Sequence, residues 1–282
     1  METKTLGRPA AVAAFTMLVL LLTLASATYA WFTSGNRVST SRVTARSGSE
    51  TVELQISSTG GADFRAVDGA AMAQVNGADP ERLMPVSTAD LRTFLTCVSQ
   101  SEANAVYREV EGEKDFFHGR VYLRAVAPEG TRGRMDLYLD QTAQGPLAVA
   151  LDGQLLNATR LGLAFPEGEG RIFSLSRESN AAADQIRNTW LNGELVPDGN
   201  VLTGGNGAIR AVPDPAVELS EYAITQSGGS FALPPRPLYS LELNEIYPVD
   251  IYFYLEGCDP DCSDAVSFHA ADLTLAFFGV LS

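Results

Sequence analysis

The sequence predicts an all-β fold, namely a two-sheet antiparallel β-sandwich of the jelly-roll kind with one or two short helices and long loops. Several segments alternate apolar and polar residues, which is typical of strands with one buried face. Glycine (25) and proline (14) are plentiful enough for many turns, and helical periodicity is scarce. With 282 residues, 45% of them hydrophobic, the chain can bury a sizeable core.

The alternating segments are the basis of the predicted sandwich. Residues 248–257, "PVDIYFYLEG", alternate most clearly, and each segment of this kind must cover its apolar face with a second sheet. The last segment is apolar on both faces because of Ala276 and Phe278, so we expect it inside a sheet. The predicted strands are 51–57, 120–127, 134–140, 160–165, 171–176, 248–257 and 271–281.

Two segments are helix candidates. Residues 87–100 carry Ser87 as a cap and apolar residues at helical spacing, and residues 179–191 are a weaker candidate. Residues 192–237 are rich in Gly, Pro and Asn, which predicts a loop-rich insertion with at most a short hairpin. The expected organisation is a signal peptide (1–30), an extended arm (31–49) and a sandwich domain (50–282).

The first thirty residues have the pattern of a secretory signal, so we expect a secreted protein in the extracellular matrix or on the cell surface. Lys4 and Arg8 precede an uncharged run over residues 10–32, and small residues gather at its end. Cleavage after Ala27 or after Ala30 fits these small residues. An uncleaved membrane anchor is the alternative, because the run exceeds the roughly 18 residues that a spanning helix needs.

The charge distribution limits the partners. A net charge of -14 argues against nucleic acid and against anionic membrane surfaces, so we expect membrane contact only through an uncleaved signal segment. Residues 31–49 nevertheless contain three arginines and no acidic residue. A basic arm therefore precedes an acidic body.

The arm has the β-prone sequence "NRVSTSRVTA", which can add a strand to the edge of a sheet. The sheet is either the chain's own or that of a neighbour, and a neighbour's sheet would give a head-to-tail filament. The residues expected to carry strand donation are Trp31, Phe32, Arg37, Val38, Arg42 and Val43.

Catalytic motifs are missing from the sequence. It has no HEXXH zinc motif, no G-x-S-x-G elbow and no phosphate-binding loop, and its two histidines, His118 and His269, have no second ligand at metal spacing. We therefore expect a protein that is not an enzyme.

The segment "EGCDPDCSD" (256–264) is the one cluster with ligand chemistry. Cys258 and Cys262 are close enough to form a disulfide, which export permits. Asp259, Asp261 and Asp264 offer oxygen ligands for calcium, but the twelve-residue calcium loop pattern is absent, so a disulfide-pinned acidic turn without a cofactor is favoured. Cys97 is either a buried small hydrophobe or the partner of one of the other two cysteines.

The stretch "TYAWFTSGNRVST" followed by "ARSGSETVELQIS" resembles the N-terminal region of the TasA/camelysin family of Gram-positive bacteria. The resemblance covers about residues 30–55. It implies that Thr28-Tyr29-Ala30 is the exit motif, that a signal peptidase of the SipW type cleaves after Ala30, and that Trp31 is the mature N-terminus. The sequence departs from the family where Thr33-Ser34 replace the usual acidic residue.

The resemblance also implies a function. Family members are jelly-roll subunits of biofilm-matrix fibres that donate the N-terminal arm to the next subunit, so the expected partner is a second copy of the chain. The metallopeptidase activity described for a camelysin branch has no visible ligand set in this sequence. A monomeric cell-surface adhesin or ligand-binding sandwich, with calcium as its one candidate cofactor, is the alternative.

Overall fold

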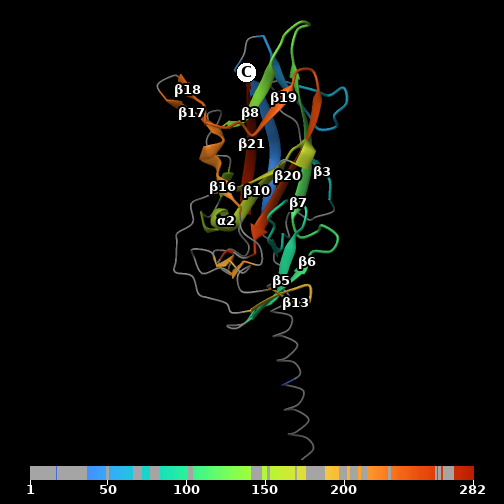
Figure 1. Cartoon of the computed structure of the whole chain (residues 1–282), viewed down its shortest axis with the longest axis vertical. Coiled ribbons are helices and arrows are strands. Elements are labelled where there is room, and N and C mark those ends of the chain that lie inside the picture. The colour runs from blue at the N-terminus through green and yellow to red at the C-terminus, as the bar shows by residue number, and fades with distance from the viewer. Residues whose placement is uncertain are drawn as a thin grey trace, which may run out of the picture. The chain divides into compact units, whose positions relative to one another are not determined.

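The computed structural model divides the chain into two compact units, Met1–Gly35 and Asn36–Ser282, and every described strand belongs to the second (Figure 1). The description that follows concerns this second unit. The described residues are 17, 37–48, 51–65, 72–76, 83–100, 104–140, 148–150, 153–168, 170–175, 188–196, 202–203, 209–210, 215–227, 230–257, 259, 262 and 270–282.

The first sheet has seven strands in the order β1-β21-β8-β17-β18, with β19 added beside β8 and β9 beside β21. Its long strands β21 and β8 are antiparallel neighbours. The bounds are β1 Arg37–Ser47, β8 Arg134–Asp140, β9 Ala148–Ala150, β17 Ala223–Ser227, β18 Ser230–Ala232, β19 Tyr239–Glu242 and β21 Ala270–Leu281.

The second sheet has eight strands in the order β16-β11-β10-β20-β7-β2, with β3 added beside β7 and β4 beside β20. Its centre is the antiparallel trio β10, β20 and β7. The bounds are β2 Glu53–Ser57, β3 Ala73–Gln74, β4 Pro85–Val86, β7 Phe117–Val126, β10 Thr159–Ala164, β11 Gly170–Ser174, β16 Val217–Glu218 and β20 Ile246–Glu256.

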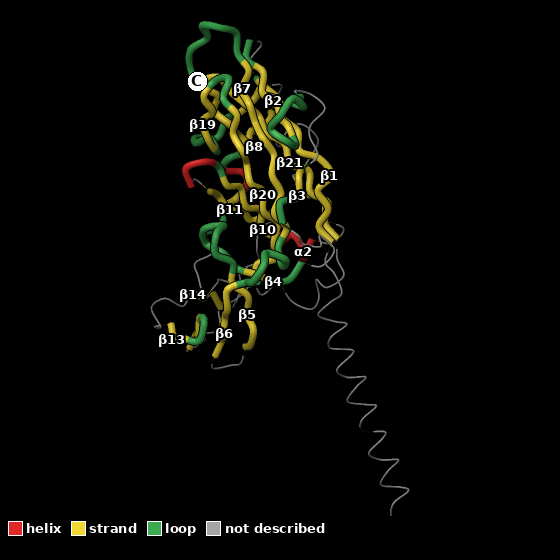
Figure 2. The backbone as a smooth tube through the Cα atoms, turned by 90° about the vertical axis from the view of Figure 1, so that its right-hand side faces the viewer, coloured by secondary structure: helices red, strands yellow, loops and turns green. Residues whose placement is uncertain are grey.

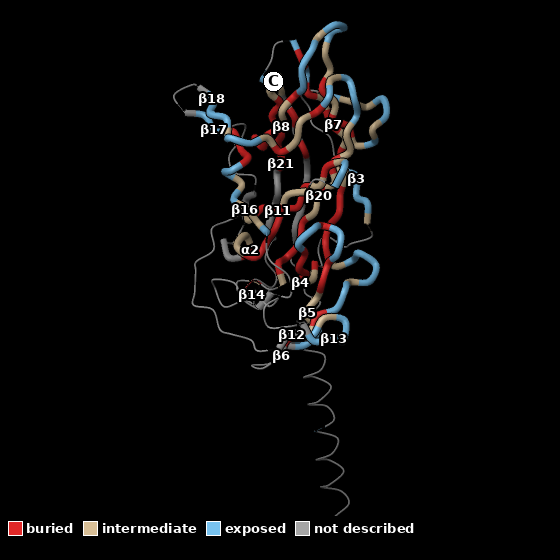
Figure 3. Tube along the Cα trace, in the orientation of Figure 1, coloured by how far each residue is buried: buried red, intermediate tan, exposed pale blue. Residues whose placement is uncertain are grey.

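The two large sheets share one apolar core, which confirms the all-β prediction (Figure 3). Leu137 and Phe277 enter this core from the seven-stranded sheet, and Leu123, Ile251 and Phe253 enter it from the eight-stranded sheet. Every predicted strand is found, within a few residues of its expected bounds. The alternation was a sufficient signal because each side chain's face is fixed by the period of two.

The sheets are mixed rather than purely antiparallel. Parallel pairs join β1 to β21, β11 to β16, β17 to β8 and β20 to β4, and they add short or terminal strands to the antiparallel centre. Local alternation carries no information about the direction of a neighbouring strand, so these pairings could not be read from it.

The basic arm forms β1, which lies at the edge of the seven-stranded sheet and pairs in parallel with β21 of the same chain (Figure 2). Val43 pairs with Leu275 and Ala45 with Phe277, and all four side chains are buried in the shared core. Strand β21 therefore has neighbours on both sides, as its two apolar faces predicted.

A third sheet of four strands has the order β13-β12-β6-β5. Asn192 and Gly193 both have positive φ, 51° and 87°, as the two-residue hairpin turn between β12 and β13 requires. This hairpin joins the β5–β6 hairpin through a parallel pairing of β12 with β6. The bounds are β5 Leu95–Gln100, β6 Asn104–Glu109, β12 Asn188–Leu191 and β13 Glu194–Val196.

The helix predicted over residues 87–100 is wrong. Ser87 forms an isolated β-bridge with Leu95, residues 88–94 form a loop, and the remainder is β5. The side chain of Thr88 accepts a hydrogen bond from the Leu91 N–H, and the Asp90 carboxylate accepts two, from the N–H groups of Arg92 and Thr93. These local bonds compete with a helix.

Leu91 explains why the loop is held in this shape. Its φ is 58°, an unusual value for a non-glycine residue, and its side chain is buried against Gly162 of β10. Burial of the Leu91 side chain offsets the strain in its backbone. The apolar residue whose spacing suggested a helix instead packs against the eight-stranded sheet.

The predicted insertion over 192–237 contains more strand than expected. It begins in the hairpin β12–β13 and includes the two-stranded sheet of β14 (Leu202–Thr203) and β15 (Ile209–Arg210), then β16, β17 and β18. The weaker helix candidate, 179–191, ends in β12, and the rest of it lies outside the described residues.

One short α-helix, α2 (Gly153–Ala158), precedes β10 and was not expected from the sequence. Across the described parts of the chain, no helix has both the length and the apolar character needed to cross a membrane. Apart from Met17, the predicted signal segment and both candidate cleavage positions lie outside the described residues.

Replacing Gly162 with alanine should destabilise the fold by about 1–3 kcal/mol, because the new Cβ would lie 2.4 Å from Leu91 Cδ2 and force the Leu91 side chain to move. Thermal unfolding followed by circular dichroism measures the change. Gly170→Ala is the matched control, since its Cβ would meet the same leucine at an ordinary 3.6 Å. Equal losses in both variants would contradict the role given to Leu91.

Candidate functional site

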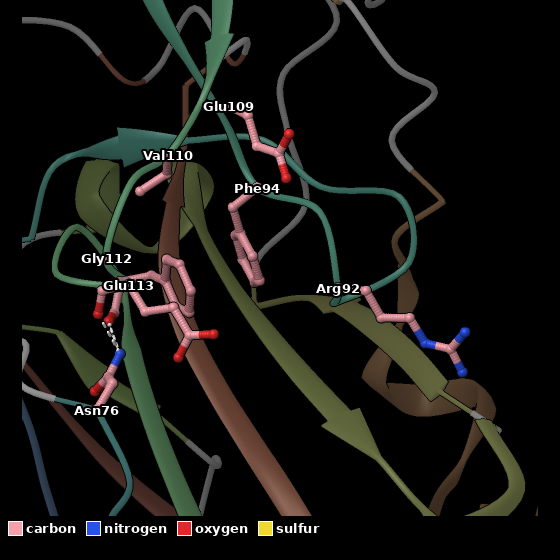
Figure 4. A pocket seen from close by; sticks show the side chains of 8 residues that line it. Asn76, Arg92, Phe94, Glu109, Val110, Gly112 and Glu113 are labelled. Atoms are coloured by element: carbon pink, nitrogen blue, oxygen red, sulfur yellow. Dashed lines mark hydrogen bonds between the residues drawn. The ribbon is translucent and has the colours of Figure 1, made fainter.

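A pocket of about 510 Å³ lies beside the connection between β6 and β7 (Figure 4). One wall comes from the loop before β5, one from the β6–β7 connection, and one residue follows β3. The lining residues are Asn76, Arg92, Phe94, Glu109, Val110, Gly112, Glu113 and Phe116.

The floor of the pocket is aromatic. The rings of Phe94 and Phe116 stack with their centroids 3.7 Å apart, and Tyr254 of β20 meets Phe94 edge-on at 5.7 Å. Both phenylalanines are buried, so the stack ties the pocket to the outer face of the eight-stranded sheet.

Asn76 holds the β6–β7 connection in place. Its amide nitrogen donates to the carbonyl oxygens of Glu113 (2.8 Å) and Phe116 (2.7 Å), and its amide oxygen accepts from the His118 N–H (3.2 Å). Gly112 and Glu113 both have positive φ, 82° and 48°, which gives the tight turn that brings the Glu113 carboxylate to the pocket.

An ionic network continues from the pocket along β7 and β20. Asp250 accepts hydrogen bonds from Arg120 Nε (2.6 Å), Arg120 Nη2 (2.8 Å) and His118 Nε2 (3.0 Å). The strand register makes this possible, because it places Arg120 opposite Asp250 and His118 opposite Tyr252.

This network shifts several pKa values. Burial alone would raise the pKa of Asp250, but the hydrogen bonds from His118 and Arg120 outweigh it and hold the pKa below its ordinary value. Burial, followed by the negative charges of Asp250 and Glu113, raises the pKa of Tyr252 to about 12. Asp250 is therefore an ionised acceptor at neutral pH, and the field around Tyr252 is negative.

The residues predicted for strand donation are only partly described. Arg37, Val38, Arg42 and Val43 all belong to β1, where Val43 is buried in the core and a register shift falls between Thr40 and Arg42. The predicted cleavage residues Ala30 and Trp31, and Phe32 after them, lie outside the described residues.

The acidic turn after β20 is anchored by a buried ion pair. Asp259 Oδ2 accepts from Arg160 Nη2 at 2.7 Å, and both side chains are 0% exposed. A cation at this carboxylate would have to compete with the guanidinium, which favours a structural role for Asp259.

The other residues of the predicted disulfide and calcium site are mostly not described. Cys258, Asp261 and Asp264 lie outside the described residues, so the disulfide and calcium remain predictions. Cys262 packs beside Leu155 and Leu255.

Cys97 lies in β5 and is only half-buried, so it is not the fully buried hydrophobe considered above. Its Sγ lies 3.5 Å from the carbonyl oxygen of Ser99, and burial raises the pKa of its thiol. A thiol that resists ionisation is a poor nucleophile.

The pocket was not predicted from the sequence. His118 has no second ligand at metal spacing along the chain, and Asp250 is one residue of the alternating segment 248–257. The alternation of 248–257 places Asp250 and Tyr252 on one outward face, which is the signal that was available. Their partners on β7 depend on a strand register that no local pattern supplies.

Replacing Asp250 with asparagine should destabilise the protein at pH 7 by about 2 kcal/mol, because Arg120 and His118 would lose an ionised acceptor. The depressed pKa means that this stability is present above the unfolded value of about 3.9 and is lost as the pH falls below it. Urea unfolding at pH 7, 5 and 3 should show the difference between the two proteins shrinking as the pH falls below the unfolded pKa. Exposed Glu245→Gln is the control, and a difference that does not shrink between pH 5 and pH 3 would argue against the assignment.

Replacing Arg160 with methionine should cost about 3–5 kcal/mol, because it leaves the buried Asp259 carboxylate without its guanidinium. The double variant Arg160→Met/Asp259→Leu should recover much of the loss, since it removes both charges. Thermal denaturation of the three proteins measures this coupling. A double variant as unstable as the single one would show that the pair itself is not the cause.

Comparison with known proteins at three levels gave no match. No protein-family model matches the chain, and neither a curated protein nor a solved structure is similar to it. The function is therefore inferred from the residues of this chain and their geometry.

Proposed function

We propose that the chain is a secreted, non-enzymatic structural subunit of extracellular matrix fibres, joined head to tail by exchange of the strand 37–47. The observation that carries the proposal is the position of β1. It is the edge strand of the seven-stranded sheet, and its Val43 and Ala45 side chains are buried in the shared core. An edge strand of this kind can be supplied by the same chain or by a neighbour.

The pairing of β1 makes exchange inexpensive in free energy. Its contacts with the seven-stranded sheet are made through β21, in a register that runs from Arg37–Ala270 to Ser47–Gly279. A neighbour's β1 would form the same pairs and bury the same Val43 and Ala45. The closed and exchanged forms would therefore differ mainly in the segment that joins β1 to β2.

Charge supports the same proposal. The arm carries Arg37, Arg42 and Arg46, whereas the chain from Glu50 onward has 15 basic and 33 acidic residues. A basic strand is attracted to an acidic body, and this holds for the body of a second copy as much as for its own. The resemblance of residues 30–55 to the TasA/camelysin family points in the same direction.

The alternative is a monomeric adhesin or ligand-binding sandwich, and the pocket beside Phe94 and Phe116 favours it. The pocket is lined by charged and aromatic residues, most of them in the connections beside the eight-stranded sheet, and binding sites are commonly built this way. The two functions are compatible, because β1 and the pocket are built on different sheets.

A cross-linking experiment tests strand exchange. Thr44 and Ala276 are paired in the parallel register, and neighbouring strands are close enough for a disulfide. With the three native cysteines changed to serine, chains carrying Thr44→Cys and chains carrying Ala276→Cys are mixed, unfolded, refolded and oxidised. Exchange predicts a covalent heterodimer on a non-reducing gel.

The control uses Val280→Cys in place of Ala276→Cys, because that position is four residues out of register. Heterodimer yields that match between the two mixtures would argue against exchange. Electron microscopy of the chain from Trp31 onward, beside a chain that begins at Glu50, then tests assembly: fibres should form only when the arm is present, and equal fibre formation by both would contradict the proposal.

A further inference from the structure

A second pocket, of about 410 Å³, lies beside the connection between β10 and β11. One wall is the loop before β5, one is the β10–β11 connection with the start of β11, and one is the segment that leads into β16. Its charged lining residues are Arg92, Arg171 and Asp90. This arginine pocket therefore has a positive lining on a chain whose net charge is -14.

The loop that carries Arg92 is held in its shape by contacts within the chain. The buried Leu91 side chain packs against β10, and Asp90 Oδ1 accepts hydrogen bonds from the N–H groups of Arg92 and Thr93, each at 2.8 Å. The one acidic side chain of the lining is thus engaged with its own backbone. A wall that is already ordered loses little conformational entropy when a ligand binds.

The Arg92 guanidinium lies against the β10–β11 connection. Figure 4 shows its side chain directed away from Phe94 and Glu113. A Cβ on Gly168 would lie 2.5 Å from Arg92 Nη2, so the glycine leaves the space that the guanidinium occupies. Within the part of the chain that the structure describes, this side chain makes neither a hydrogen bond nor an ion pair, so its N–H donors are available to a ligand.

Arg171 brings a second guanidinium to the same connection. Its Nη1 donates to the carbonyl oxygen of Gly170 at 2.8 Å, and its Cζ lies 5.9 Å from the centre of the Tyr222 ring. These contacts hold a half-buried side chain in place without neutralising it, because Arg171 has no ion pair with any described residue. Gly168 and Gly170 are two residues apart, so both guanidinium groups approach one short stretch of backbone.

The lining selects the kind of anion. The fork of N–H donors on a guanidinium matches the paired oxygens of a carboxylate or phosphate. The remaining wall is largely apolar, and Ile172, Pro215 and Val217 belong to it. A carboxylate on an aliphatic stem would use both the donors and this apolar wall, whereas inorganic phosphate would use only the donors.

We propose that the arginine pocket binds a carboxylate at the end of a short aliphatic group, with Arg92 and Arg171 as its donors. The chemistry is that of the C-terminus of a peptide or of a free alkanoic acid. Binding here is independent of strand exchange, because no residue of β1 lines the pocket.

Isothermal titration of the full chain tests the proposal with two probes, hexanoate and Nα-acetyl-alanyl-leucine with a free carboxylate. At least one should bind, and its amide, which carries no charge, should bind at least about tenfold more weakly. Inorganic phosphate should also bind more weakly, because it has no stem. Binding of the peptide alone identifies a peptide C-terminus as the ligand, whereas binding of hexanoate shows that a free acid suffices.

Two variants locate the site. Arg92→Gln and Arg171→Gln should each weaken binding about tenfold, because each removes a charged donor. Arg92→Gln should leave the melting temperature unchanged, since the Arg92 side chain has no described hydrogen bond to lose. The matched control is Arg236→Gln, an exposed arginine outside the pocket lining, which should leave binding unchanged.

Four results would overturn the proposal. They are the absence of binding by both probes at millimolar concentration, equal affinities for a probe and its amide, an affinity for phosphate that matches that of the tighter probe, and equal effects of Arg92→Gln and Arg236→Gln on binding.

Discussion

The structure depends on one constraint: two sheets, each apolar on one face, must bury those faces against each other. Because side chains alternate along a strand, fixing the inward residues also fixes the outward ones. Val121 and Ile251 point into the shared core, and this obliges Arg120 and Asp250 to lie on the outer face. The same packing that stabilises the body therefore places the ionic network beside the pocket.

The sequence predicted most of the strands, because their side chains alternate locally. It predicted little about which strands pair with each other and in which register. The alternation in 248–257 located β20 and both of its faces. Leu91 misled the helix prediction, because its spacing fits a helix while the hydrogen bonds of Thr88 and Asp90 form a loop. The candidate site could not be predicted from the sequence for a related reason. Glu113 approaches His118 across a turn, and His118 approaches Asp250 only because β7 pairs with β20.

The two candidate functional features belong to different sheets. Strand β1 is the edge of the seven-stranded sheet, whereas the pocket stands on β7 and β20 of the eight-stranded sheet. Among the residues that line the pocket, none belongs to β1, and the shared core lies between the two large sheets. A subunit of this design can join its neighbours with one layer and present a binding surface with the other.

The parallel pairing of β1 with β21 has a consequence for how the protein reaches its native state. The paired residues are separated by more than 200 positions along the chain, so the loop that their contact closes is among the longest in the fold. Contacts between distant residues form slowly, and a chain that emerges N-terminus first exposes β1 long before β21 exists. During that interval β1 has not yet met the strand with which it pairs. Under the proposed strand exchange, the timing of synthesis, as well as equilibrium affinity, would influence whether this strand first pairs with its own chain or with another copy.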